Sequence, residues 1–108
     1  MNTVADLASF LRGRWGEEER DADLFHELDC PVSPEARRAG GCGCPCPARI
    51  LDRTAVQRRI LDRCERRMRH EQKEGPCWPL DSVLAFQSMK ALALPYELHP
   101  SWRDIWYP

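Results

Sequence analysis

Apolar side chains recur at three- and four-residue steps along the first quarter of the chain, as one face of a helix requires. This spacing predicts a helix over residues 3–28. Its apolar positions are Val4, Leu7, Ala8, Leu11, Trp15, Ala22, Phe25 and Leu28. Gly13 and Gly16 lie inside it, and each costs about 1 kcal/mol relative to Ala in a helix interior. The two glycines favour a bend or break near Trp15.

The helical pattern stops in residues 29–47, DCPVSPEARRAGGCGCPCP, which are rich in proline and glycine and cannot propagate a helix throughout. We interpret them as a connecting loop. It is longer than the usual 2–8 residues between packed helices. Such a loop generally has a function or a ligand that holds it in place.

Two further helices are predicted after the loop. One begins at Pro47, a favoured first-turn residue, and covers residues 47–73. Its apolar positions are Ile50, Leu51, Val56, Ile60, Leu61, Cys64 and Met68. A shorter helix follows over residues 81–94, between the capping residue Asp81 and Pro95.

Residues 95–108 form an aromatic tail that is too apolar to remain in solvent, so we expect it to pack across the helices. The predicted fold is mainly α: an antiparallel helical hairpin, a third shorter helix and the aromatic C-terminal tail. A long Cys/Pro/Gly loop joins the hairpin. A chain of 108 residues corresponds to a single domain over residues 1–108.

Charge is distributed unevenly, although the formal net charge is only -1. Residues 1–29 carry three Arg against eight acids, and residues 48–73 carry nine basic residues against four acids. The two long helices are therefore complementary, which favours cross-helix ion pairs of roughly 0–1 kcal/mol each. The alternative is an Arg-rich helix that meets a phosphate backbone. Its basic residues are Arg58, Arg59, Arg63, Arg66, Arg67 and Arg69.

No apolar run approaches the ~20 residues that cross a bilayer, and the N-terminal segment lacks the pattern of a secretory signal. A cytoplasmic protein is expected. In a reducing compartment, six cysteines favour metal binding or redox chemistry over disulfides.

The length of the second helix divides the cysteines into two groups, one near each end of that helix. Cys64 lies eighteen positions after Cys46, or ~27 Å along the helix, so these two thiols cannot share one ion. Cys64 is expected to be a small buried hydrophobe. An antiparallel hairpin instead brings the end of the first helix beside the start of the second. The candidate ligands gathered there are His26, Cys30, Cys42, Cys44 and Cys46.

Zinc suits these ligands, because thiolate and imidazole groups bind it tetrahedrally and closing the loop around it adds folding free energy. With three or more cysteines the site would be structural. Three alternatives remain open: reduced cysteines without metal, a four-thiolate iron–sulfur cluster on Cys30, Cys42, Cys44 and Cys46, and haem or regulated disulfides.

The sequence contains no GxSxG, P-loop or HExxH pattern, so we expect no enzymatic activity. We predict a small protein-interaction module with a structural zinc site, and a partner surface at Trp102, Trp106 and Tyr107, because aromatic residues anchor interfaces. Two alternatives are a nucleic-acid-binding accessory protein that uses the Arg-rich helix, and a cysteine redox sensor.

Three blocks of sequence, LASFLRGRWGEEE, PARILDRTAVQRRIL and LALPYELHPSWRDIW, resemble a small actinobacterial and actinophage family classed as a domain of unknown function. The resemblance implies a phage or high-GC bacterial source, and hence a phage-encoded modulator of a host protein. It assigns no catalytic residue. Family members commonly have a His-Asp pair before the PAR block, whereas this chain has Pro45 and Cys46.

Overall fold

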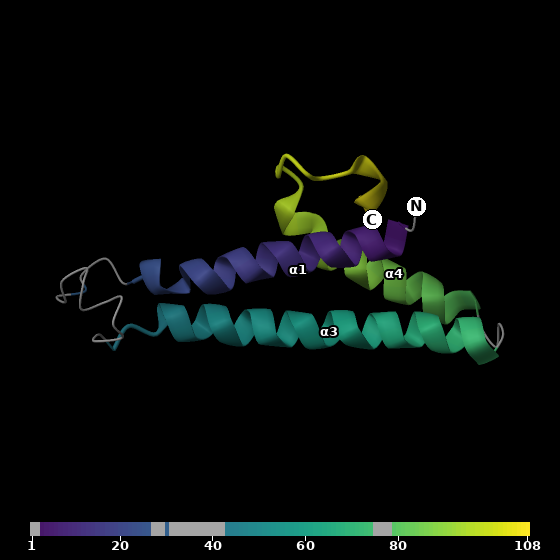
Figure 1. Ribbon diagram of the computed structural model, residues 1–108, viewed down its shortest axis with the longest axis horizontal. Helices are drawn as coiled ribbons and strands as arrows, with labels where there is room; N and C mark the ends of the chain where they lie inside the picture. Colours follow the sequence, from purple (N-terminus) through teal and green to yellow (C-terminus); the bar gives the residue numbers. More distant parts are fainter. Residues whose placement is uncertain (1–2, 27–29, 31–42, 75–78) are drawn as a thin grey trace.

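The computed structural model describes residues 3–26, 30, 43–74 and 79–108 (Figure 1). Over these residues the protein is helical and contains no strand, which confirms the mainly α class. The α-helices of the described residues are α1 (Thr3–Asp21), α3 (Cys46–Glu74) and α4 (Pro79–Ala93). Three short 3₁₀ turns accompany them: η1 (Ala22–Leu24), η2 (Leu94–Tyr96) and η3 (Asp104–Trp106). The bounds of α3 and α4 agree with the predicted helices to within two residues.

The first helix passes both glycines without interruption, so the bend expected near Trp15 is absent. Leu7, Leu11 and Trp15 are completely buried along one face of α1. Burying one large apolar side chain contributes about 1.5–3 kcal/mol, and three of them outweigh the cost of about 1 kcal/mol for each glycine.

The first helix is shorter than predicted, because its α-helical part ends at Asp21 rather than near residue 28. The η1 turn follows, and the backbone N–H of Phe25 donates to the Ala22 carbonyl at 3.2 Å. A 3₁₀ turn has 3.0 residues per turn, so it shifts the face on which later side chains lie. Ala22 remains buried, whereas Phe25 is 54% exposed. Leu28, the last predicted core position of this helix, lies outside the described residues.

The helices α1 and α3 lie side by side in antiparallel directions, and α4 returns along α3 and crosses α1 (Figure 1). Predicted ion pairs join the first two helices. Arg58 of α3 contacts Glu19 of α1 at 2.5 Å, and Arg53 contacts Glu18 at 3.3 Å. In a third contact the base comes from α1 and the acids from α3: Arg12 pairs with Asp62 and Glu65. The complementary charges of the two helices are therefore used within the hairpin.

The core lies where all three α-helices and the tail meet. Its buried residues include Leu11 and Trp15 of α1, Leu61 and Cys64 of α3, Met89 and Ala93 of α4, and Trp106. Cys64 is 8% exposed, which confirms its expected place in the core. Burial raises the pKa of its thiol.

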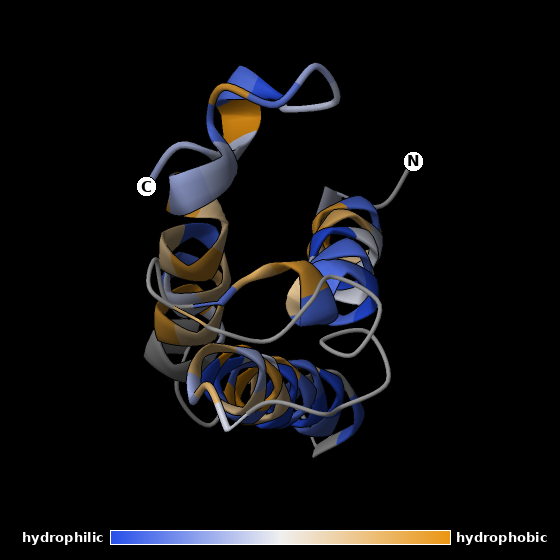
Figure 2. Ribbon diagram, turned by 90° about the vertical axis from the view of Figure 1, so that its left-hand side faces the viewer, coloured by the Kyte–Doolittle hydropathy of each residue, from blue (hydrophilic) through white to orange (hydrophobic). Residues whose placement is uncertain are grey.

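The predicted apolar face of α3 is only partly buried, because Leu51, Val56 and Ile60 are 45%, 50% and 38% exposed. For Leu51, near the start of α3, the reason is a difference in length between the helices. With 29 residues against 15, α3 is ~43 Å long and α4 only ~22 Å, so α4 covers about half of α3. In Figure 2 the apolar residues of α4 contrast with the hydrophilic surfaces of α1 and α3.

The tail packs over α1, as predicted, and Phe10 lies at the centre of the contact. The Phe10 ring meets those of Tyr96, His99 and Trp102 edge-on, and its centroid lies 4.8 Å from that of Trp106. No helix among the described residues has the length and apolar character needed to cross a membrane.

Candidate metal centre

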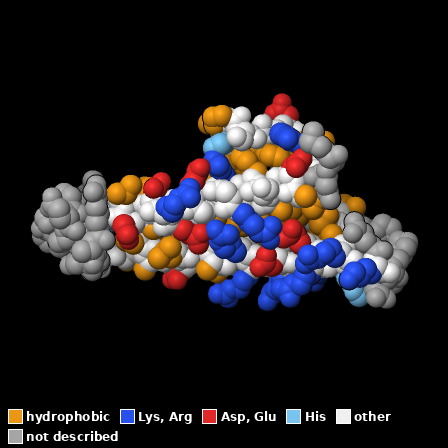
Figure 3. Space-filling model, in the orientation of Figure 1, with side chains coloured by type: hydrophobic (Ala, Val, Ile, Leu, Met, Phe, Trp, Pro, Cys, Tyr) orange, Lys and Arg blue, Asp and Glu red, His pale blue; other side chains and the backbone are white. Residues whose placement is uncertain are grey.

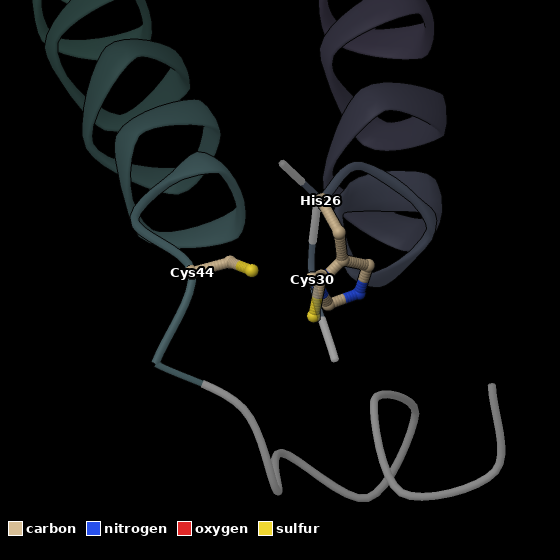
Figure 4. Close-up of side chains that lie close together, drawn as sticks. All are labelled: His26, Cys30 and Cys44. Atoms are coloured by element: carbon tan, nitrogen blue, oxygen red, sulfur yellow. The ribbon is translucent and has the colours of Figure 1, made fainter. Parts of the chain in front are cut away.

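Three of the predicted metal ligands meet at the pole of the hairpin where α1 ends and α3 begins. The ligand atoms of His26, Cys30 and Cys44 all lie within 4.8 Å of one another. Figure 4 shows the Cys44 thiol directed from the start of α3 toward His26 and Cys30 beside the end of α1. All three residues are half-buried.

The separation of these atoms is close to that of a tetrahedral zinc site. Bonds of about 2.3 Å to sulfur and 2.0–2.1 Å to nitrogen place neighbouring ligand atoms about 3.6–3.8 Å apart around the ion. The three ligand atoms of this pole are at most 4.8 Å apart, so side-chain movements of about 1 Å close the gap. The donor set, one imidazole nitrogen and two sulfurs, is also the kind that zinc prefers.

The η1 turn orients the imidazole of His26. Its Nε2 lies 2.5 Å from the Asp23 backbone carbonyl, and because a carbonyl only accepts, Nε2 must carry the proton. The lone pair of the neutral ring is therefore on Nδ1. Metal-binding histidines characteristically donate their other N–H to a backbone carbonyl or a carboxylate in this way. This supporting contact depends on a backbone conformation that side-chain spacing does not reveal.

The start of α3 holds Cys44 just outside the helix. The Arg49 N–H donates to the Pro45 carbonyl at 3.0 Å, which closes the first turn, and Cys46 is the first helical residue. Cys46, the first residue of α3, does not belong to the described group of three. Cys42 lies outside the described residues. The structure thus brings together three of the five predicted ligands.

The aromatic residues predicted as a partner surface have different environments. Tyr107 is 60% exposed and Trp102 is half-buried, but Trp106 is only 3% exposed. Trp106 packs between the rings of Phe10 and Trp102, so it is a core residue and not an accessible contact. Composition alone could not show this, because Phe10 lies almost a hundred positions earlier in the chain.

The Arg-rich part of α3 is divided between two roles. Arg53 and Arg58 pair with α1, whereas five arginines further along make no ion pair with any residue that the structure describes. These are Arg59, Arg63, Arg66, Arg67 and Arg69. Figure 3 shows Lys and Arg side chains gathered along α3, most densely toward its C-terminal half.

The fold and the site define a class of protein: a small helical hairpin protein with a Cys/His cluster at one pole, where a metal ion could bind. The chain belongs to the family of unknown function DUF6221, whose model matches residues 4–108. This match confirms the expectation of a family without an assigned function. No curated protein and no solved structure shows a significant match to the chain.

Proposed function

We propose that this protein is a small non-enzymatic protein-interaction module whose hairpin pole is held together by a structural zinc ion. One observation carries the zinc: the ligand atoms of His26, Cys30 and Cys44 lie within 4.8 Å of one another, and the residues lie beside the ends of two separate helices, α1 and α3. A fourth thiolate, from Cys42 or Cys46, would complete a tetrahedral set. Such a closed set leaves no open position for a substrate, which makes the zinc structural.

Weak hydrophobic packing at this pole supports a structural ion. Leu24, Phe25 and Leu51 are 61%, 54% and 45% exposed, so apolar burial contributes little here. The core lies further along the bundle, where α4 covers α3. A metal ion that links the end of α1 to the start of α3 would replace the missing core, because metal-binding free energy adds to folding free energy.

The interaction role is the second part of the proposal. Several large apolar side chains stay exposed on the helices, and Tyr107 stays exposed on the tail, which is the surface character of a protein that meets a partner. The resemblance to actinobacterial and actinophage proteins suggests the setting that we propose: a phage-encoded protein that modulates a host protein in the bacterial cytoplasm.

Elemental analysis of protein purified without chelator tests the zinc. We expect roughly one equivalent of zinc in the wild type and less than about a tenth in Cys30→Ser, Cys44→Ser and His26→Gln. Cys64→Ser is the matched control, since Cys64 is buried in the core away from the pole. Cobalt substitution adds a geometric readout, because tetrahedral Co²⁺ absorbs visible light far more strongly than octahedral Co²⁺. Metal-free, correctly folded wild-type protein would refute the zinc site.

Chelation tests whether the ion is structural. An ion present at a thousand times its Kd stabilises the folded state by about 4 kcal/mol. A strong chelator should therefore lower the Tm of the wild type and leave that of Cys44→Ser unchanged. Equal unfolding of wild type with and without chelator would show that any bound zinc is not structural. Iron and acid-labile sulfide in the purified protein would point to a cluster instead.

A further inference from the structure

An apolar hollow of about 240 Å³ opens between α3 and α4. We call it the α3–α4 groove. It is lined by the apolar residues Ile60, Cys64, Leu84 and Ala85, which we call its floor, by Arg63 and Arg67, which we call its rim, and by Ser88. None of these residues belongs to the candidate metal centre.

The floor of the groove exposes large apolar side chains to solvent. Ile60 is 38% and Leu84 55% exposed, and Val56, one helical turn before Ile60, is 50% exposed. The α4 helix buries Ala85 and Met89 on one face and still presents Val83 and Leu84 to solvent. A helix that is apolar on both faces is normally covered on both, and clustered exposed apolar residues mark interaction sites.

The rim of the groove is positive and not neutralised. Arg63 and Arg67 are one helical turn apart, both are exposed, and neither makes an ion pair with a described residue. Two acids of α3 next to these arginines, Asp62 and Glu65, are already paired with Arg12 of α1. A third, Glu71, lies one turn after Arg67 and forms no ion pair with a described residue. A ligand in the groove would therefore meet two available guanidinium groups beside an apolar floor.

We propose that the α3–α4 groove docks an acidic amphipathic helix of a protein partner. Leucine-like side chains at positions i, i+3 or i+4 and i+7 would fill the floor, and flanking Glu or Asp would pair with Arg63 and Arg67. Ile60 and Arg67 are separated by ~10 Å of helix, so a partner segment of about three turns covers the groove. This inference rests on the proposed interaction role but is independent of the zinc.

Charge and polarity favour this occupant over two others. A second copy that docked the same face by two-fold symmetry would bring Arg63 and Arg67 near the same residues of its partner, and like charges oppose such an interface. A nucleic acid would engage the arginines through phosphate, but the apolar floor of Ile60 and Leu84 would gain nothing from a charged backbone.

The test uses the full-length chain as purified and a synthetic probe. The probe is a fluorescein-labelled, end-capped helix of about four turns, with Leu at i, i+4 and i+7 and Glu and Ala elsewhere. One control peptide has the same composition but distributes Leu around the helix, and a second replaces Glu by Lys. Fluorescence anisotropy should show the amphipathic Glu probe binding at least about tenfold more tightly than either control, which is a difference of about 1.4 kcal/mol.

Matched variants locate the binding to the groove. Leu84→Glu should weaken probe binding more than about tenfold, whereas Leu98→Glu, at a leucine that is 94% exposed on the tail, should change it less than about twofold. Arg67→Glu should weaken binding and reduce its salt dependence, whereas Arg49→Glu, at an exposed position on the same helix but outside the groove, should not. Circular dichroism checks that each variant is folded.

Several outcomes would overturn the proposal. One is equal binding of the Leu84→Glu and Leu98→Glu variants to the probe. Another is a dimer by light scattering that Leu84→Glu converts to monomer, which would assign the groove to a second copy. A third is salt-sensitive binding of duplex DNA or RNA that Arg67→Glu abolishes and Leu84→Glu leaves intact. Loss of zinc with intact probe binding would refute the zinc site alone, and loss of probe binding with intact zinc would refute the groove alone.

Discussion

Replacement of Trp106 by alanine tests whether this residue anchors the tail or is held ready for a partner. Its side chain is 3% exposed, and its ring centroid lies 4.8 Å from that of Phe10 and 5.7 Å from that of Trp102. The guanidinium of Arg103 lies 5.7 Å from the same ring. The Phe10 contact joins the tail to α1, and the other two lie within the tail, so the truncation should loosen the junction between the tail and α1.

The expected loss follows from the burial. A Trp→Ala change in a core costs about 3–5 kcal/mol, including the stacking contacts. The indole Nε1 of Trp106 is buried and makes no hydrogen bond with a described residue, and removing an unpaired donor recovers part of its desolvation cost. We therefore expect the lower end, about 3 kcal/mol. This is a large share of the 5–15 kcal/mol typical of a domain, and it corresponds to a fall in Tm of roughly 12 °C.

Urea unfolding followed by circular dichroism measures the effect, with Ile105→Ala as the control. Ile105 is the preceding residue in the chain and is 62% exposed, so its truncation should cost less than about 1 kcal/mol. If the tail detaches before the helices unfold, the Trp106→Ala curve should also show an early transition and a smaller m-value. Indistinguishable stabilities for the two variants would refute the anchoring role and restore Trp106 as a candidate partner contact.

Two pH-dependent effects are also expected. Arg58 holds the pKa of Glu19 below its usual value of 4.5, so this pair contributes stability above that pH and loses it as the pH falls through the lower folded value. Arg58→Gln should cost about 0.2–1 kcal/mol at neutral pH and make acid unfolding less steep; an unchanged acid limb would contradict this. Burial, together with the hydrogen bond to Glu18, raises the pKa of Tyr96 above its usual value of 10.0. The neutral Tyr96 phenol contributes its full stabilisation below that pH and loses it as the pH rises. Tyr96→Phe should therefore make the alkaline side of the stability-against-pH curve less steep. A Tyr96 phenol that ionises at its usual pH in the folded protein would rule out the effect.

The helical segments follow from local features of the sequence. The three- and four-residue apolar spacing, Pro47 at the start of α3 and Pro95 after α4 predict where α3 and α4 begin and end, because these effects act within a few residues. The opposite charges of the two long helices also predict the ion pairs between them. The length of α3 alone excludes a metal site shared by Cys46 and Cys64, and it predicts a site near His26 and Cys30 instead.

Tertiary structure decided which apolar residues are buried and which ligands meet. An apolar pattern shows that a helix has an apolar face, but not how far a neighbour covers it. Because α4 is half as long as α3, Leu51 near the start of α3 stays exposed. Phe10, far away in the sequence, covers Trp106. The same reasoning holds at the pole. His26 comes near Cys44 where α1 gives way to a 3₁₀ turn, whereas Cys46, the first residue of α3, is not in the described group. Burial and ligand geometry depend on contacts between distant segments, and only the packed helices determine those contacts.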